Sequence, residues 1–234
     1  MSSPPVEFGF VAAPVGEPGL DDAALYEEIL ADCERHRALG YSAAWVLEHH
    51  FSDYFPMPGP LLVLAHVAGR FPDLSLGTCV LVTPWYEPLR LAGEIAALTH
   101  LTQRHLHLGL GRGTAKYEYD AFGVEMQEAR ERFRECWEVL DRALDGEPFT
   151  YEGRYLQVDK EIRVRPRPRR ERVTSTARSA PPRARRSSPT SACRRSARRS
   201  ETSRRSGRPC THGATGRQSW PSSCLLYTSD AADE

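Results

Sequence analysis

A short polar cluster, Glu48-His49-His50, follows an apolar stretch and provides side chains that can move protons. A histidine changes charge near neutral pH, and a neighbouring carboxylate such as Glu48 favours its protonated form. The cluster suits acid–base catalysis or metal binding, or it is a hydrogen-bonded histidine pair that closes a strand. Because neighbouring strand residues point to opposite faces, His49 and His50 cannot easily share one metal ion. We therefore interpret His49 as the residue that faces a ligand and His50 as its support.

A second cluster, Gly111-Arg112-Gly113, provides the groups that a phosphate requires. Glycines let a ligand approach the backbone N–H groups closely, and a guanidinium binds phosphate oxygens through paired hydrogen bonds. Turns of this kind are also common for steric reasons alone. The motif by itself therefore leaves a phosphate site and a simple turn both open.

The six cysteines form no C-x-x-C pair and no metal-finger spacing, which favours reduced thiols. Cys79 is expected to be a small buried residue rather than a nucleophile. No apolar run is long enough to span a membrane, and the N-terminus does not resemble a secretion signal. We therefore expect a cytoplasmic protein without a metal site.

The elements that position these clusters alternate along the chain. Their alternation favours parallel strands joined by helical crossovers, with the polar clusters at the carboxyl ends of the second and fourth strands. A barrel and an open doubly wound sheet both fit this pattern. The expected strands are residues 6–11, 42–47, 74–81 and 106–110, the expected helices are 21–40, 60–69, 89–101 and 125–144, and a hairpin is expected over 149–155.

The zero formal net charge of the 234 residues hides a division of charge along the chain. Residues 1–162 carry 26 acidic and 13 basic side chains, whereas residues 163–234 carry 5 acidic side chains and 18 arginines. An asymmetry of this size is typical of a nucleic-acid or acidic-partner tail.

Beyond Arg163 the sequence shows no strand or helix period and is rich in Arg, Ser, Pro, Ala and Thr up to about Ser223. Such a segment buries too little apolar area to offset its ordering entropy, so we expect it to be disordered or poorly packed. The predicted domains are residues 1–165, which fold, and residues 166–234, a non-native tail. We favour a frameshift near Arg167, followed by adapter-like sequence over residues 224–234, above a functional arm that binds nucleic acid.

Several motifs occur in the order and spacing typical of the luciferase-like (bacterial luciferase) superfamily of flavin-dependent monooxygenases. Together they cover roughly residues 6–168, so the chain resembles the N-terminal half of such a protein. The motifs are Trp45–Phe51, Leu76–Pro84 with Pro88-Leu89-Arg90, Leu108–Gly113, and Phe122-Gly123-Val124 followed by Arg130 and Trp137.

The resemblance implies an α/β fold, a (β/α)8 TIM barrel truncated here to roughly its first four β/α units. It also implies reduced FMN as co-substrate, O2, a small organic substrate, a separate flavin reductase and, for the intact protein, a homodimer. One alternative is a relative that uses a deazaflavin for hydride transfer. A non-enzymatic flavin- or nucleic-acid-binding protein with a basic tail is the other alternative.

For the site, the resemblance assigns a catalytic role in oxygen insertion to His49, supported by His50. It assigns the flavin phosphate to Arg112, with Gly111 and Gly113 allowing close approach, and a non-proline cis peptide at Cys79–Val80 beneath the flavin ring. Strands five to eight of a complete barrel are absent from the expected elements. We therefore expect that this chain does not bind flavin tightly and is inactive as it stands.

Overall fold

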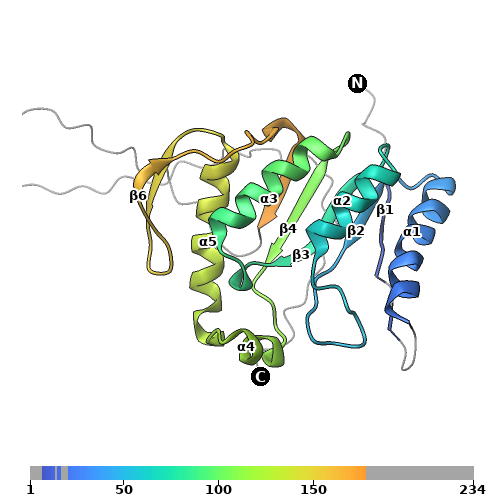
Figure 1. Cartoon of the computed structure of the whole chain (residues 1–234), viewed down its shortest axis with the longest axis horizontal. Coiled ribbons are helices and arrows are strands. Elements are labelled where there is room, and N and C mark those ends of the chain that lie inside the picture. Colours follow the sequence, from blue (N-terminus) through green and yellow to red (C-terminus); the bar gives the residue numbers. More distant parts are fainter. Residues whose placement is uncertain (1–6, 14, 17–20, 178–234) are drawn as a thin grey trace, which may run out of the picture. The chain divides into compact units, whose positions relative to one another are not determined.

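The fold is built on a five-stranded parallel sheet with the strand order β1-β2-β3-β4-β7 (Figure 1). The computed structural model of the chain describes residues 7–13, 15–16 and 21–177. The expected tail from residue 178 onward lies outside these residues. The strands span Gly9–Val11 (β1), Ala43–Val46 (β2), Ser75–Val82 (β3), Leu106–Gly111 (β4) and Val173–Ala177 (β7).

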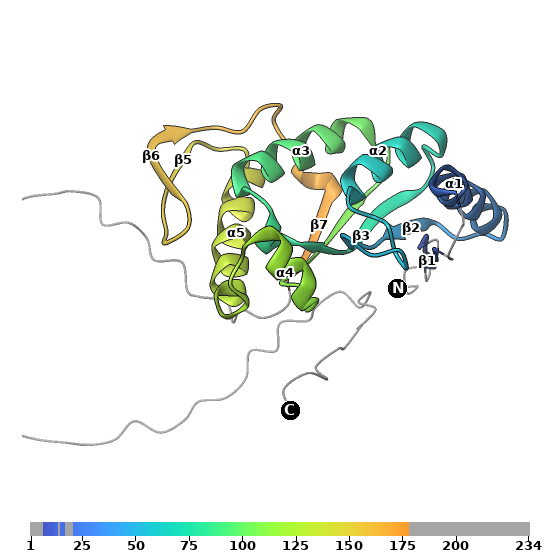
Figure 2. The ribbon, with the colours of Figure 1, turned by 60° about the horizontal axis from the view of Figure 1, so that its bottom comes forward.

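Helices connect these strands, as the alternating pattern predicts, and α2, α3 and α5 cover one face of the sheet (Figures 1 and 2). Strand residues such as Leu76, Leu106 and Leu108 are fully buried against helix residues such as Ile95 and Leu140. Burial of this apolar layer is the main source of stability. The connecting helices are Asp22–Ala38 (α1), Pro60–Arg70 (α2), Pro88–Leu101 (α3), Lys116–Phe122 (α4) and Ala129–Leu144 (α5), with single 3-10 turns at Thr83–Trp85 (η1), Met126–Glu128 (η2) and Arg170–Arg172 (η3).

The opposite face of the sheet carries a mixture of aromatic, polar and small residues. Parallel pairing places Trp45, Gly77, His107 and Thr174 in one row across β2, β3, β4 and β7. Since residues paired in this way point to the same side, the row lies on the face that is turned away from the buried leucines. It would face the interior of a closed barrel.

The fifth strand corrects the expectation that regular structure ends near Arg163. Strand β7 pairs in parallel with β4 from Val173↔Leu106 onward. The preceding segment is also fixed on the helix layer, since the Arg169 N–H donates to Thr99 Oγ1 at 3.0 Å. The strand was missed because Val173 is its single bulky apolar residue, and main-chain pairing leaves no signal in the sequence. Folded structure therefore continues to Ala177, beyond the predicted boundary at residue 165.

The segment before α5 also differs in detail from the expectation. Helix α4 was not predicted as a helix, and it ends at Gly123, which adopts a left-handed φ of 65°. The helix expected from residue 125 begins at Ala129, after the 3-10 turn η2. None of the helices that the structure describes is long and apolar enough to cross a membrane.

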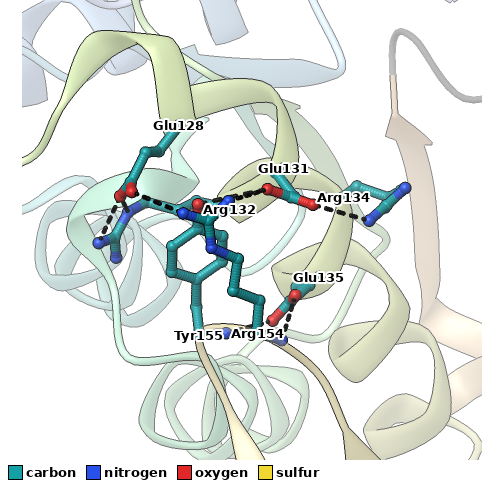
Figure 3. A network of polar contacts seen from close by, with 7 residues as sticks. All are labelled: Glu128, Glu131, Arg132, Arg134, Glu135, Arg154 and Tyr155. Carbon is teal, nitrogen blue, oxygen red and sulfur yellow. Dashed lines mark hydrogen bonds and ion pairs between the residues drawn. The ribbon is translucent and has the colours of Figure 1, made fainter.

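The expected hairpin is present as the antiparallel strands Phe149–Glu152 (β5) and Gln157–Ile162 (β6). Its turn docks on α5 through Glu135, whose buried carboxylate accepts the backbone N–H groups of Arg154 at 2.6 Å and of Tyr155 at 2.9 Å (Figure 3). Arg154 also pairs with Glu131 at 2.9 Å. The guanidinium of Arg132 lies 4.3 Å from the centre of the Tyr155 ring. These contacts fix the hairpin to the helix layer.

Candidate functional site

The residues singled out in the sequence lie at the carboxyl ends of β2, β3 and β4. His49 and His50 follow β2, Cys79 and Val80 lie in β3, and Arg112 follows β4. Because the strands are parallel neighbours, these ends form one edge of the sheet. The fold therefore brings both polar clusters to the same edge.

Glu48 is buried at this edge and binds His50. Its Oε1 lies 2.8 Å from His50 Nε2, and its Oε2 accepts the Val82 N–H at 2.8 Å. Burial raises the pKa of Glu48, while the hydrogen bonds from His50 and Val82 oppose the shift. The expectation that Glu48 acts on His49 is wrong. In an extended chain, residues two apart point to the same side, so Glu48 faces His50, whereas the adjacent His49 points to the opposite side.

The carboxylate that contacts His49 belongs to Glu118 of α4, a residue that sequence reasoning missed. Its Oε1 lies 3.2 Å from His49 Nδ1 and accepts the backbone N–H of His50 at 2.9 Å. The Glu118 side chain is 2% exposed. A short buried helix could have been recognised here from Gly123, which is a typical helix C-terminus, and from the acidic residue next to Tyr119 that precedes it.

His49 is the more accessible of the two histidines, with a side chain 38% exposed against 12% for His50. Its backbone N–H donates to the carbonyl of Met57 at 3.1 Å. Its ring stacks on Phe55, with centroids 5.8 Å apart and planes 19° from parallel. The imidazole is thus fixed by its surroundings and still reaches the surface at the sheet edge.

Arg112 lies in a turn that is held from both sides. The Tyr119 hydroxyl donates to the Arg112 carbonyl, and desolvation raises the pKa of Tyr119 to about 12. Gly113 has a φ of 76°, a conformation that a side chain disfavours. A Cβ on Gly111 would come within 2.6 Å of Val80 Cγ2, so only glycine fits this position without displacement. Within the described residues, nothing pairs with the Arg112 guanidinium.

The peptide bond between Cys79 and Val80 is cis, as the resemblance implies. The expectation that Cys79 is buried is wrong, because the residue is exposed. Leu76 and Leu81 of the same strand are fully buried in the apolar core and Gly77 is covered by Trp45, whereas Cys79 lies outside that core.

An aromatic cluster lies beside the Arg112 turn. Trp85 of η1 stacks on Phe122, with centroids 5.0 Å apart, and meets Tyr119 edge to face at 4.5 Å. Its indole Nε1 is buried without a hydrogen-bond partner among the described residues. A buried donor without a partner costs free energy, so this indole marks a locally unsatisfied position next to the Arg112 turn.

These features fit a flavin mononucleotide. The guanidinium of Arg112 is available for a phosphate, and the glycines of its turn leave room for a ligand close to the backbone. By contrast, the described residues hold no group of three His, Cys, Asp or Glu side chains that could bind a metal ion.

Comparison with known proteins identifies the family. The sequence profile of the family described as luciferase-like monooxygenase matches residues 6–188, which is most of the chain. The chain belongs to the luciferase-like monooxygenase family. The match confirms the resemblance on which the expected fold and site rest.

Two curated relatives illustrate the level of similarity. The uncharacterized protein y4vJ of Sinorhizobium fredii is 44% identical over 119 residues, which cover 51% of this chain and 34% of the relative. The oxygenase component of the flavin-dependent trigonelline monooxygenase of Acinetobacter baylyi is 30% identical over 138 residues, which cover 58% of this chain and 38% of that relative. The chain thus spans less than half the length of the curated relatives it matches.

Solved structures of luciferase-like proteins share the fold. The monooxygenase RslO1 from Streptomyces bottropensis superposes with a TM-score of 0.63 at 30% identity, over 73% of this chain and 53% of that one. The oxygenating constituent of 3,6-diketocamphane monooxygenase from Pseudomonas putida, in complex with FMN, gives a TM-score of 0.61 at 20% identity, over 67% and 44%. The F420-dependent tetrahydromethanopterin reductase of Methanopyrus kandleri gives a TM-score of 0.57 at 22% identity, over 74% of this chain and 50% of that one.

These neighbours decide between the two sheet architectures that the sequence left open. The structural neighbours are luciferase-like TIM-barrel proteins, so the five-stranded sheet is part of a (β/α)8 barrel and not an open doubly wound sheet. The expectation of a truncated barrel is therefore confirmed. The likeness to the FMN-bound and F420-dependent structures concerns the fold alone.

Proposed function

We propose that the sheet edge of this chain is the N-terminal half of the active site of an FMN-dependent monooxygenase, which inserts one oxygen atom into a small organic substrate. The observation that carries the proposal is that two groups lie at the carboxyl ends of neighbouring strands. One is the accessible His49, supported by a buried carboxylate, and the other is the Arg112 guanidinium, which has no partner among the described residues. Family membership supports the same reaction class.

Each residue has a distinct role in this proposal. The guanidinium of Arg112 binds the phosphate, and the turn glycines allow its close approach. The imidazole of His49 exchanges a proton with the reacting group, while His50 supports the strand end through Glu48. Cys79 and Val80 lie beneath the ring of the cofactor. Reduced FMN would supply two electrons to O2 and the substrate, which is oxidised, would supply the other two, so that one oxygen atom enters the substrate and the other leaves as water.

Completion of the barrel is part of the proposal. Strands β1 and β7 are the outermost strands of the described sheet, and a closed barrel needs further strands that pair with both of them. We therefore propose that the 234-residue chain binds flavin weakly and is inactive, and that the activity belongs to a protein of family length. A separate flavin reductase supplies reduced FMN to that protein, which we expect to be a homodimer.

The test is an oxygen-consumption assay on the gene product restored to family length, supplied with a flavin reductase and NADH. Substrate-dependent oxygen uptake with reduced FMN is the expected result, and His49→Gln should lower it by about 100-fold or more if the imidazole transfers a proton. An enzyme that uses only a deazaflavin and consumes no oxygen would overturn the proposal in favour of hydride transfer.

A further inference from the structure

Helix α4 connects the two halves of the candidate site through two consecutive residues. Glu118 reaches back to His49 and to the main chain of His50, while Tyr119 donates its hydroxyl hydrogen to the carbonyl of Arg112. The helix is seven residues long and begins four residues after Arg112. It therefore fixes the proton-exchanging side chain and the phosphate-binding turn relative to one another.

The hydrogen bonds of Glu118 determine which imidazole nitrogen of His49 carries the proton. Oε1 accepts the His50 N–H at 2.9 Å, so this oxygen acts as an acceptor. The same oxygen lies 3.2 Å from His49 Nδ1. An acceptor facing a ring nitrogen is satisfied only when that nitrogen bears hydrogen. In the neutral imidazole the lone pair is then on Nε2.

His50 provides the internal contrast. Its Nε2 is occupied by Glu48 at 2.8 Å, and its side chain is 12% exposed. His49 uses Nδ1 instead, its side chain is 38% exposed, and its Nε2 has no partner among the described residues. Two adjacent histidines are thus held by two buried carboxylates through different nitrogens, and only His49 keeps its Nε2 open.

We propose that Glu118 is a positioning residue that holds neutral His49 in the tautomer with the proton on Nδ1, leaving Nε2 as the free base at the sheet edge. The carboxylate acts through His49 and does not itself contact the reacting atoms. An orienting carboxylate of this kind fixes both the tautomer and the ring direction of a catalytic histidine. The proposal rests on the proposed function only for its catalytic consequence, since the tautomer is a property of the chain without flavin.

The test is a long-range 1H–15N correlation spectrum of the 15N-histidine-labelled 234-residue chain, recorded without flavin at a pH where His49 is neutral. His49→Gln assigns the signals. The expected result is a protonated Nδ1 and an unprotonated Nε2 for His49. A His49 signal with the proton on Nε2 in the unmodified chain overturns the proposal, whatever the variants do.

Variants sharpen the assignment to Glu118. Glu118→Gln offers an amide that can donate as well as accept, so the Nδ1–H tautomer should lose its dominance, whereas Glu118→Asp should retain part of it. Asp120→Asn is the matched control, because it removes an exposed acid from the same helix and should leave the His49 signals unchanged. Equal spectra for Glu118→Gln and the unmodified chain would contradict the proposal. Since no cofactor is present, that outcome would leave the monooxygenase proposal standing.

Discussion

The indole of Trp45 stacks on the imidazole of His107, with ring centroids 5.3 Å apart and planes 24° from parallel. The indole lies across Gly77, where an added Cβ would come within 2.3 Å of Trp45 Cε3. On the other side, a Cβ on Gly9 would come within 2.5 Å of Trp45 Nε1. Two glycines in neighbouring strands thus make room for one aromatic side chain on the barrel-interior face of the sheet.

The first prediction concerns this space. Gly77→Ala should lower the free energy of unfolding by about 1–3 kcal/mol, because the methyl group collides with the Trp45 ring. Urea denaturation measures the change. Gly69→Ala in α2 is the control, since nothing lies within 4 Å of its added Cβ. Alanine is the better helix former, so the control should gain up to about 1 kcal/mol. Equal effects of the two changes would contradict the packing of Trp45.

The second prediction concerns pH. Desolvation, reinforced by His105, lowers the pKa of His107 below its ordinary value of 6.5. Between the lowered value and 6.5, the unfolded chain binds a proton that the folded chain does not, so the free energy of unfolding falls as the pH falls. The stabilisation is fully present above pH 6.5 and is lost as the pH falls toward the lowered pKa.

Urea denaturation at several pH values between 5 and 8 measures this dependence. His107→Gln should make the stability less dependent on pH in this range, because it removes the group that titrates differently in the two states. His66→Gln, which changes an exposed histidine on α2, should keep the dependence of the unmodified chain. The prediction is wrong if both variants behave alike.

The third prediction concerns the attachment of the hairpin. Glu135→Gln should lower the free energy of unfolding by about 1–3 kcal/mol. The buried carboxylate accepts the N–H groups of Arg154 and Tyr155 with its two oxygens, and an amide has only one oxygen that can accept. Glu131→Gln removes a more exposed ion pair with Arg154 and should lower the free energy of unfolding by less than Glu135→Gln does. Thermal or urea denaturation compares the two. A larger loss for Glu131→Gln would show that the surface pairs, rather than the buried carboxylate, hold the hairpin.

The fourth prediction concerns the arginine-rich segment of the sequence. Because β7 and its contacts continue to Ala177, we expect any change of reading frame to lie beyond that residue rather than near Arg167. Sequencing the gene across this region should reveal another frame that encodes further strand and helix patterns. Codon usage that stays uniform in the present frame to Ser223 would contradict this expectation.

Much of the fold could be predicted because its signals are local. The apolar run that ends at Glu48 and the glycine-rich end of β4 indicate buried strands whose polar ends lie at one edge. The motifs around them also identified the family correctly. Strand β7 was missed, because Val173 is its single bulky apolar residue and its pairing with β4 depends on main-chain hydrogen bonds.

The site was predictable only in part, because its decisive contacts are distant in sequence. Glu118 lies 69 residues from His49, and no spacing rule connects them. The adjacent Glu48 was the obvious partner for His49, yet the extended backbone turns it toward His50. The exposure of Cys79 was missed for a similar reason, since burial depends on what covers a strand and not on the residue type.

Titration of the 234-residue chain with FMN and with riboflavin tests the central claim most directly. The two ligands share the ring and differ in the phosphate that Arg112 is proposed to bind. The quenching of flavin fluorescence should give a dissociation constant in the high-micromolar to millimolar range for FMN, and weaker binding for riboflavin. The preference should disappear in Arg112→Gln and persist in Arg90→Gln, which changes an exposed arginine of α3. Equal binding of FMN and riboflavin would contradict the phosphate site, and low-micromolar FMN binding by a monodisperse chain would contradict the need for a completed barrel.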